Sequence, residues 1–187
     1  VLVYNSKKYN NKIKLSKKLE DLYLCNVSSS VKTLGSVKSL RIDLEYINSI
    51  YTEESMDKES IDLLFELVFN PNVKDNAFDL ETFNLCKNNI IDQVKGIKEN
   101  AAVYSSLKFE SILNKGNPSG LVVVDVKDYE NITNESLYEL YKKVLNYQIN
   151  ISILGNYNND FVCNYIDSKL KKIIKNKVLK KLTELGK

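Results

Sequence analysis

Apolar and polar residues alternate in the first quarter of the chain, which predicts a β-hairpin. Leu40, Ile42 and Leu44 alternate with charged residues, as in a strand with one solvated face. A Gly-Ser pair ahead of them suits the turn of a hairpin. The pattern therefore predicts antiparallel strands over about residues 26–33 and 38–47.

Elsewhere the apolar residues recur every three or four positions, which predicts helices. Polar capping residues and an Asn-Pro pair mark where these helices begin and end. We expect a first helix over about residues 13–24 and a second that carries the apolar positions Ile61 to Val68 and ends at Asn70-Pro71. A long helix should follow an N-cap at Asp79, and a further helix should follow a bend near Asn100. The last two helices should begin after an N-cap at Thr133 and in "NDFVCNYIDSKLKKII".

Two further apolar runs, "LVVVDV" and "INISILGNY", read as extended segments, and the second is a buried strand over 149–155. Strands in hairpins or between helix pairs, without regular βαβ alternation, favour an α+β fold. We expect a mostly antiparallel sheet of 26–33, 38–47 and 149–155 with helices packed on one face. The predicted core is Leu40, Ile42, Leu44, Leu64, Leu67, Ile90, Val94, Leu137, Leu140 and Ile153.

The length of 187 residues suits one ordinary domain. The first residue is Val1, so we expect a piece of a longer protein. Apolar residues make up 43% of the chain, enough for a substantial core. We assign residues 1–175 to one domain, the N-terminal half of a larger unit lacking its first strands, and residues 176–187 to a basic helical tail or linker.

The chain has three widely spaced cysteines and no histidine. Unpaired, widely spaced cysteines indicate reduced thiols and a cytoplasmic location. The absence of histidine excludes a Ser-His or Cys-His nucleophile pair and any histidine-based metal site within these residues. No apolar run approaches about 20 residues, so we expect no membrane span.

The most basic stretch covers residues 169–187 and allows two interpretations. It could be a cationic amphipathic helix for nucleic acid or an anionic membrane. The net charge of +3 is small, and no interleaved aromatic residues suggest base stacking. We therefore favour a solvated last helix, with neither nucleic acid nor membrane as partner. The glycines of "NKGNPSG" match no phosphate-binding motif and read as a turn.

Gln93 lies on the edge of the apolar stripe of the long helix, seven residues after Cys86. An amide on that edge must find hydrogen-bond partners or remain unsatisfied, at a cost of about 1–3 kcal/mol. From spacing alone, Gln93 is a boundary residue beside the core. Nearby carboxylates, Asp79, Glu81 and Asp92, are scattered around the helix axis and read as a cap and solvent-facing charges.

The order of these pieces resembles the insulinase/pitrilysin-type peptidase family, most closely its non-catalytic bacterial branch. The resemblance runs over about residues 7–170. Three stretches carry it: "LLFELVFNPNVKDNAFD", "NPSGLVVVDVKDYENIT" and "ITNESLYELYKKVL" with "INISILGNY". Ser119 stands where the family usually has Tyr. The resemblance implies one half of a clam-shell fold that encloses peptides.

Active members of this family hold zinc with an inverted motif, His-x-x-Glu-His, and a glutamate on the long helix. The resemblance implies that Gln93 occupies the position of that glutamate and Cys86 that of a supporting glutamate seven residues earlier. A neutral amide is a much poorer zinc ligand than a carboxylate. We therefore expect no catalytic, metal-ligating or cofactor-binding residue here.

The leading hypothesis is a non-catalytic peptidase-like domain that pairs with a homologous subunit or a second half of the same protein and helps to form a peptide chamber. Peptides are a further candidate ligand. The alternative is a fragment of an active zinc-dependent endopeptidase whose His-x-x-Glu-His motif lies upstream of Val1, with zinc as cofactor. A third hypothesis is a basic binding module acting through residues 169–187.

Overall fold

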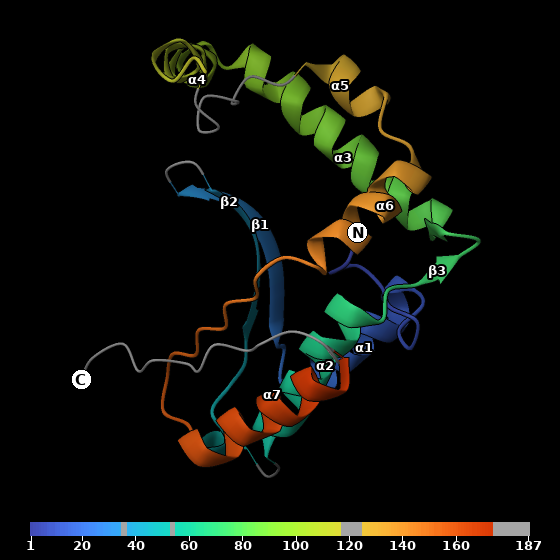
Figure 1. The fold of residues 1–187 in the computed structure, drawn as a ribbon, viewed down its shortest axis with the longest axis vertical. Helices are drawn as coiled ribbons and strands as arrows, with labels where there is room; N and C mark the ends of the chain where they lie inside the picture. The colour runs from blue at the N-terminus through green and yellow to red at the C-terminus, as the bar shows by residue number, and fades with distance from the viewer. Residues whose placement is uncertain (35–36, 53–54, 117–124, 174–187) are drawn as a thin grey trace.

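The computed structural model describes residues 1–34, 37–52, 55–116 and 125–173 (Figure 1). Within them the chain forms helices and two small antiparallel sheets, which confirms the predicted α+β class. The elements are α1 (Lys12–Asp21), β1 (Asn26–Leu34), β2 (Val37–Glu45), the 3-10 turn η1 (Ser49–Tyr51), α2 (Met56–Phe69), β3 (Val73–Lys74), β4 (Ala77–Phe78), α3 (Leu80–Glu99), α4 (Ala101–Leu113), α5 (Val126–Glu130), α6 (Asn134–Val144) and α7 (Asn159–Ile173).

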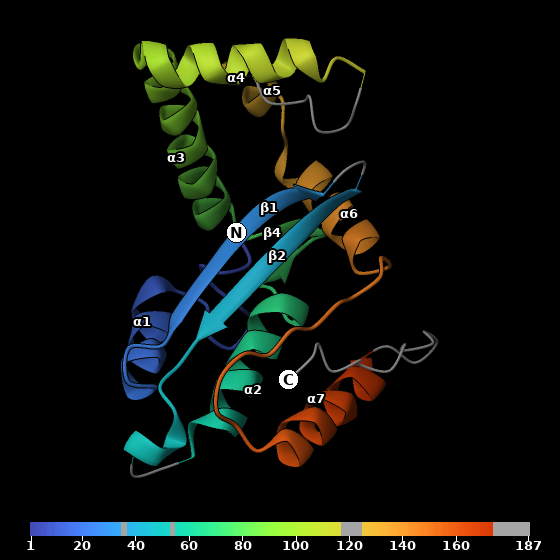
Figure 2. The same ribbon diagram turned by 90° about the vertical axis from the view of Figure 1, so that its left-hand side faces the viewer.

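β1 and β2 form the predicted antiparallel hairpin; its turn at 35–36 lies outside the described residues. At its base Val27 lies opposite Leu44, and both pack against buried side chains of α1 and α2. Further out, Val31 is 69% exposed and its partner Leu40 is 47% exposed. The distal half of the hairpin extends past α1 and α2 (Figure 2), so the prediction that Leu40 is buried was wrong.

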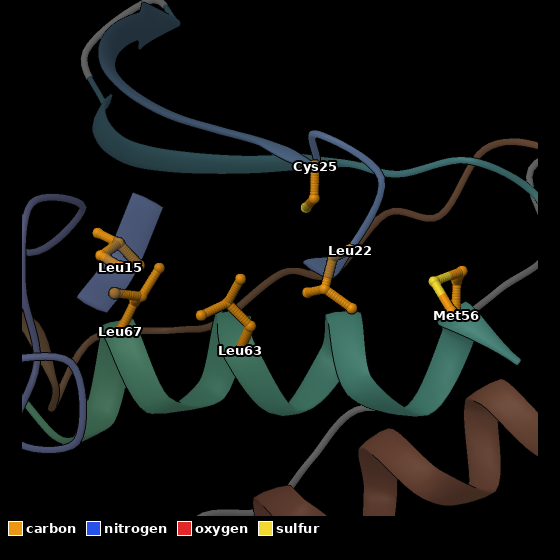
Figure 3. Close-up of a cluster of buried hydrophobic side chains, with 6 residues drawn as sticks. All are labelled: Leu15, Leu22, Cys25, Met56, Leu63 and Leu67. Atoms are coloured by element: carbon orange, nitrogen blue, oxygen red, sulfur yellow. The ribbon is translucent and has the colours of Figure 1, made fainter. Parts of the chain in front are cut away.

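Helix α2 lies at the centre and packs on two opposite faces. One face joins the cluster shown in Figure 3, formed by Leu15, Leu22, Cys25, Met56, Leu63 and Leu67. Ile61 lies two residues before Leu63 and Phe65 two residues after it, so each is turned about 200° around the helix from Leu63 and lies on the opposite face. Both join a second cluster with side chains of α7. Leu67, which the apolar spacing predicted to be buried, is fully buried.

The two predicted N-caps, Asp79 and Thr133, are present, and so is the predicted bend near Asn100. Asp79 accepts the Thr82 amide at the start of α3 (2.9 Å), and Thr133 accepts the Ser136 amide at the start of α6 (3.1 Å). Asn100 is both the C-cap of α3 and the N-cap of α4, where its side chain accepts the Val103 amide (3.1 Å). One residue thus makes the bend that the sequence predicted.

The segment at 149–155 is not a strand of either sheet, so this part of the predicted sheet was wrong. It is extended, and Ile151 and Ile153 pack against the second cluster. Its backbone has no neighbouring strand within the described part of the chain. Of the other extended segment, "LVVVDV", residues 121–124 lie outside the described residues and Val126 begins α5. The tail at 176–187 also lies outside them.

The rest of the predicted core is less buried than expected. On α6, Tyr138 and Tyr141 turn toward Phe78 with ring centroids 5.6 and 5.7 Å away, which leaves Leu140 on the outer side and 50% exposed. Ile90 is 39% exposed, because the second half of α3 runs away from both clusters (Figure 1). The half-buried members are Ile42, Leu44, Leu64, Val94, Leu137 and Ile153.

Candidate functional site

The base of α3 is fixed to the N-terminal segment. Asn5 is buried and donates to the Thr82 hydroxyl (2.7 Å), which in turn donates to the Asp79 cap (2.7 Å). Phe83 and Cys86 are the buried residues of this helix, and both lie in its first two turns. The first half of α3 is therefore held in place before the chain reaches Gln93.

Cys86 and Gln93 lie along one side of α3, since seven residues are almost two full turns, or about 10 Å of rise. Their surroundings differ: Cys86 is 9% exposed, whereas Gln93 is exposed. The Gln93 amide is therefore hydrated and carries no desolvation cost. Sequence spacing placed Gln93 beside a core, but the described part of the chain has no core at that point of α3.

Asp92, the residue before Gln93, is also exposed; its carboxylate lies 3.9 Å from the Lys95 ammonium, one turn along the helix. No three His, Cys, Asp or Glu side chains of the described residues lie close enough together to hold a metal ion. A neutral amide and a buried thiol two turns apart offer no ligand set for zinc. The assignment of Gln93 to a lost zinc ligand stays a prediction.

The neighbouring side of α3 is covered by α5. The Lys87 ammonium donates to the carbonyls of Glu130 (2.8 Å) and Ile132 (2.9 Å). Near the other end, Lys98 lies 3.2 Å from Asp125, and this hydrogen bond holds the pKa of the Asp125 carboxyl below its ordinary value. These contacts fix the rotation of α3 about its axis and leave the side with Gln93 open.

A polar pocket of about 600 Å³ lies beside α2, and the sequence interpretation missed it. Three carboxylates of α2 face it, Glu59, Asp62 and Glu66, together with the lysines Lys8, Lys18, Lys58 and Lys169. Carboxylates three and four residues apart share one side of a helix, which was the available signal. Glu66 accepts hydrogen bonds from the Ser6 hydroxyl (2.9 Å) and the Lys8 amide (2.9 Å), so it ties the N-terminal segment to α2.

Within this pocket Asp62 links α2 to α7. It accepts the Tyr165 hydroxyl (2.6 Å) and pairs with the Lys169 ammonium. Burial acts to raise the pKa of Asp62, and the hydrogen bonds from Lys169 and Tyr165 outweigh it, so the pKa lies below its ordinary value. The hydrogen bond to Asp62 raises the pKa of Lys169. Glu59 pairs with the Lys18 ammonium, so each of the three carboxylates in the pocket already has a partner.

By sequence, the chain is similar to metallopeptidase-like proteins. One relative is a Bacillus subtilis (strain 168) protein named "Probable inactive metalloprotease YmfF": 26% of 175 aligned residues are identical, covering 91% of this chain and 41% of that protein. A crystal structure of a conserved protein from Enterococcus faecalis V583 superposes with a TM-score of 0.69 at 27% identity, covering 78% of this chain and 36% of the other. No family model matches the chain.

The chain thus spans less than half the length of both relatives. Among the described residues, no helix is both long and apolar enough to cross a bilayer.

Proposed function

We propose that this chain is a non-catalytic, insulinase-type peptidase-like domain of a cytoplasmic protein. Its role is to pair with a homologous subunit, or with a second half of the same protein, and to form part of the wall of a peptide chamber. The similarity to a protein named as an inactive metalloprotease carries this proposal. The insulinase type rests on the motifs of the sequence, and the fold class is compatible with it.

The residues in the described part of α3 support a non-catalytic role. A catalytic zinc site needs three protein ligands, commonly imidazoles and a carboxylate. The 187 residues hold no imidazole, and position 93 offers an amide in place of a carboxylate. An amide brings no negative charge to offset the charge of Zn²⁺, so a site built around Gln93 would have reduced affinity.

The test is the zinc content and peptidase activity of the full-length protein. After dialysis against a weak chelator we expect well below one zinc per chain and no hydrolysis of a quenched fluorescent peptide. One tightly held zinc per chain, with hydrolysis that a strong chelator abolishes, would favour the active alternative with a motif upstream of Val1.

A pair of variants sharpens this test. Gln93→Glu restores a carboxylate at the proposed ligand position, and Asn89→Glu adds one a turn earlier on the same exposed half of α3. Without upstream histidines, neither variant should gain zinc. A gain in zinc affinity confined to Gln93→Glu would show that a near-complete site surrounds this position and that only the glutamate is missing.

The pairing role needs a separate measurement, because it does not follow from the absence of activity. Full-length protein purified from its native cells under mild conditions should bring a homologous chain with it. If the protein elutes as a lone monomer, and its deletion leaves the abundance and activity of any active homologue unchanged, the subunit role is wrong.

A further inference from the structure

Positive charge is concentrated at the start of the chain. The first 19 residues hold six lysines and no Asp or Glu, whereas the rest of the chain holds 21 basic and 24 acidic side chains. The six are Lys7, Lys8, Lys12, Lys14, Lys17 and Lys18. Because the whole chain carries only +3, this separation of charge indicates a local surface for an anionic partner.

Helix α1 presents its lysines away from the core. It buries Leu15 and, at its C-cap, Leu22 in the first cluster. Lys14 and Lys17 are exposed, and Lys14 lies one turn before half-buried Lys18 on the same side of the helix. That side leads to the polar pocket beside α2, which Lys18 lines.

The pocket adds two lysines from distant parts of the chain. Lys58 comes from α2 and Lys169 from α7, and together with Lys8 and Lys18 they line one space of about 600 Å³. Helices α1, α2 and α7 lie together at one end of the molecule, and α4 lies at the other (Figure 1). Folding therefore gathers ammonium groups from four separate segments around one pocket.

The carboxylates of the pocket are already engaged inside the fold. Glu59 pairs with Lys18, which joins α2 to α1, and Asp62 pairs with Lys169, which joins α2 to α7. Glu66 instead accepts neutral donors from the N-terminal segment. These contacts hold three flanking segments around the pocket, so its shape is set before any ligand arrives.

Two lysines of the pocket keep their charge available for a ligand. Within the described part of the chain, neither Lys8 nor Lys58 has a carboxylate within ion-pair distance, and both are exposed. The Lys8 ammonium lies 5.2 Å from the centre of the Tyr9 ring, and the Lys14 ammonium nearby donates to the neutral Asn10 side chain (3.0 Å). The pocket therefore offers ammonium donors that attract negative charge.

We propose that this face binds an acidic segment of a partner polypeptide. One Asp or Glu side chain enters the pocket at Lys8 and Lys58, and flanking carboxylates contact Lys14 and Lys17 of α1. An ammonium-lined pocket beside exposed lysines is complementary in charge to a short run of carboxylates. The site does not involve the position of Gln93, so this inference goes beyond the proposed function, and its failure would leave that function standing.

A polypeptide suits this face better than nucleic acid or a membrane. Residues 1–19 contain no arginine, the side chain that forms bidentate bonds with phosphates, and the ring of Tyr9 already lies beside the Lys8 ammonium. Glu59 and Asp62 in the pocket wall would repel a continuous row of phosphates. A bilayer surface is flat and cannot enter a concave site, whereas a single carboxylate side chain can.

The first measurement is the fluorescence anisotropy of a labelled short peptide of alternating Glu and Ser, titrated with the full-length protein. This peptide should bind saturably, and a matched peptide with Gln in place of Glu should not, because it offers no charge to the lysines. Binding should disappear in about 1 M salt, where the Debye length is about 3 Å. Equal binding of the two peptides, or binding of neither, would overturn the proposal.

Paired variants locate the site. Lys8→Gln with Lys58→Gln removes two exposed, unpaired charges and should weaken binding about 4- to 25-fold, at about two- to fivefold for each surface charge. Lys8→Arg with Lys58→Arg keeps both charges and should retain binding. The control is Lys108→Gln with Lys115→Gln, which removes the same charge at the α4 end of the molecule and should change the affinity less than about twofold. Equal losses in the two Gln pairs would overturn the site.

The last measurement tests the class of partner. A single-stranded oligonucleotide and phosphatidylserine vesicles should bind more weakly than the acidic peptide, and the exchange of Lys8 and Lys58 for Gln should not change their binding. Sedimentation at low salt should show no self-association that depends on these two lysines. Tighter, lysine-dependent binding of the oligonucleotide or the vesicles, or self-association that the Gln pair abolishes, would overturn the assignment to an acidic segment of a partner.

Discussion

Asn134 allows the sharpest test of how helix α6 is joined to strand β4. It begins α6, is 7% exposed, and bonds to both backbone groups of Phe78: its Oδ1 accepts the Phe78 amide (2.9 Å) and its Nδ2 donates to the Phe78 carbonyl (2.6 Å). β4 pairs with β3 on one edge, and the Asn134 side chain serves the other edge as a neighbouring strand would.

Replacing Asn134 with alanine removes both bonds and leaves two buried backbone groups of Phe78 unpaired. An unsatisfied buried group costs about 1–3 kcal/mol. Since a cavity the size of an amide can admit water to one of these groups, we expect a loss of about 2–4 kcal/mol in the free energy of unfolding. With a urea slope of about 2 kcal/mol per molar, the midpoint should fall by about 1–2 M with little change in slope.

The control is Asn146→Ala. Asn146 also bonds through Nδ2 to a backbone carbonyl, that of Lys142 (3.0 Å), but it is exposed, so the loss should stay within about 0.5 kcal/mol. Asn134→Asp keeps the acceptor and places a carboxylate against the Phe78 carbonyl, so it should be more stable near pH 4 than at pH 7 relative to wild type. Equal midpoints for Asn134→Ala and Asn146→Ala would refute the reasoning.

Three further outcomes are expected. Leu67→Ala, at a fully buried position, should cost about 2–5 kcal/mol in urea unfolding, and a loss below 1 kcal/mol would contradict the packing of α2. Because the pKa of Asp62 is lowered in the folded protein, the ionised carboxylate stabilises the fold above its ordinary pKa, and this stabilisation is lost as the pH falls through the folded value. Asp62→Asn should therefore reduce the free energy of unfolding by up to about 1 kcal/mol at pH 7 and flatten its pH dependence below about pH 4. Asp167→Asn, at an exposed position, is the control and should do neither. Burial raises the pKa of the Cys25 thiol to about 11, so little of it is thiolate at pH 8. A thiol reagent should therefore label half-buried Cys163 much faster than Cys25 at this pH. Equal labelling rates would show that Cys25 is accessible.

Local signals in the sequence predicted the local structure well. Asp79 and Thr133 cap their helices as expected, because a cap depends only on residues within one turn. Asn100 lies at the expected bend and also caps α4. The hairpin also followed from alternation within its own strands. These features need no information from distant parts of the chain.

Features that depend on distant segments were harder to predict. The segment at 149–155 has the composition of a strand, but strand pairing needs a partner that the described residues do not supply. The stripe on α3 predicted burial for Ile90, yet burial needs a surface to pack against. Asn134 was overlooked because asparagine at the start of a helix is common, and its partner Phe78 lies 56 residues away.

The position of α2 between two clusters has a consequence for how the protein unfolds. The α1–hairpin side and the α7 side do not need to touch each other to be coupled, because each gains its burial from the same fourteen-residue helix. Losing either side removes one of the two clusters that pack against α2, and a helix of this length is marginal by itself in water. The two sides should therefore open as one cooperative unit, whereas α4, with no buried residue, can fray without disturbing them.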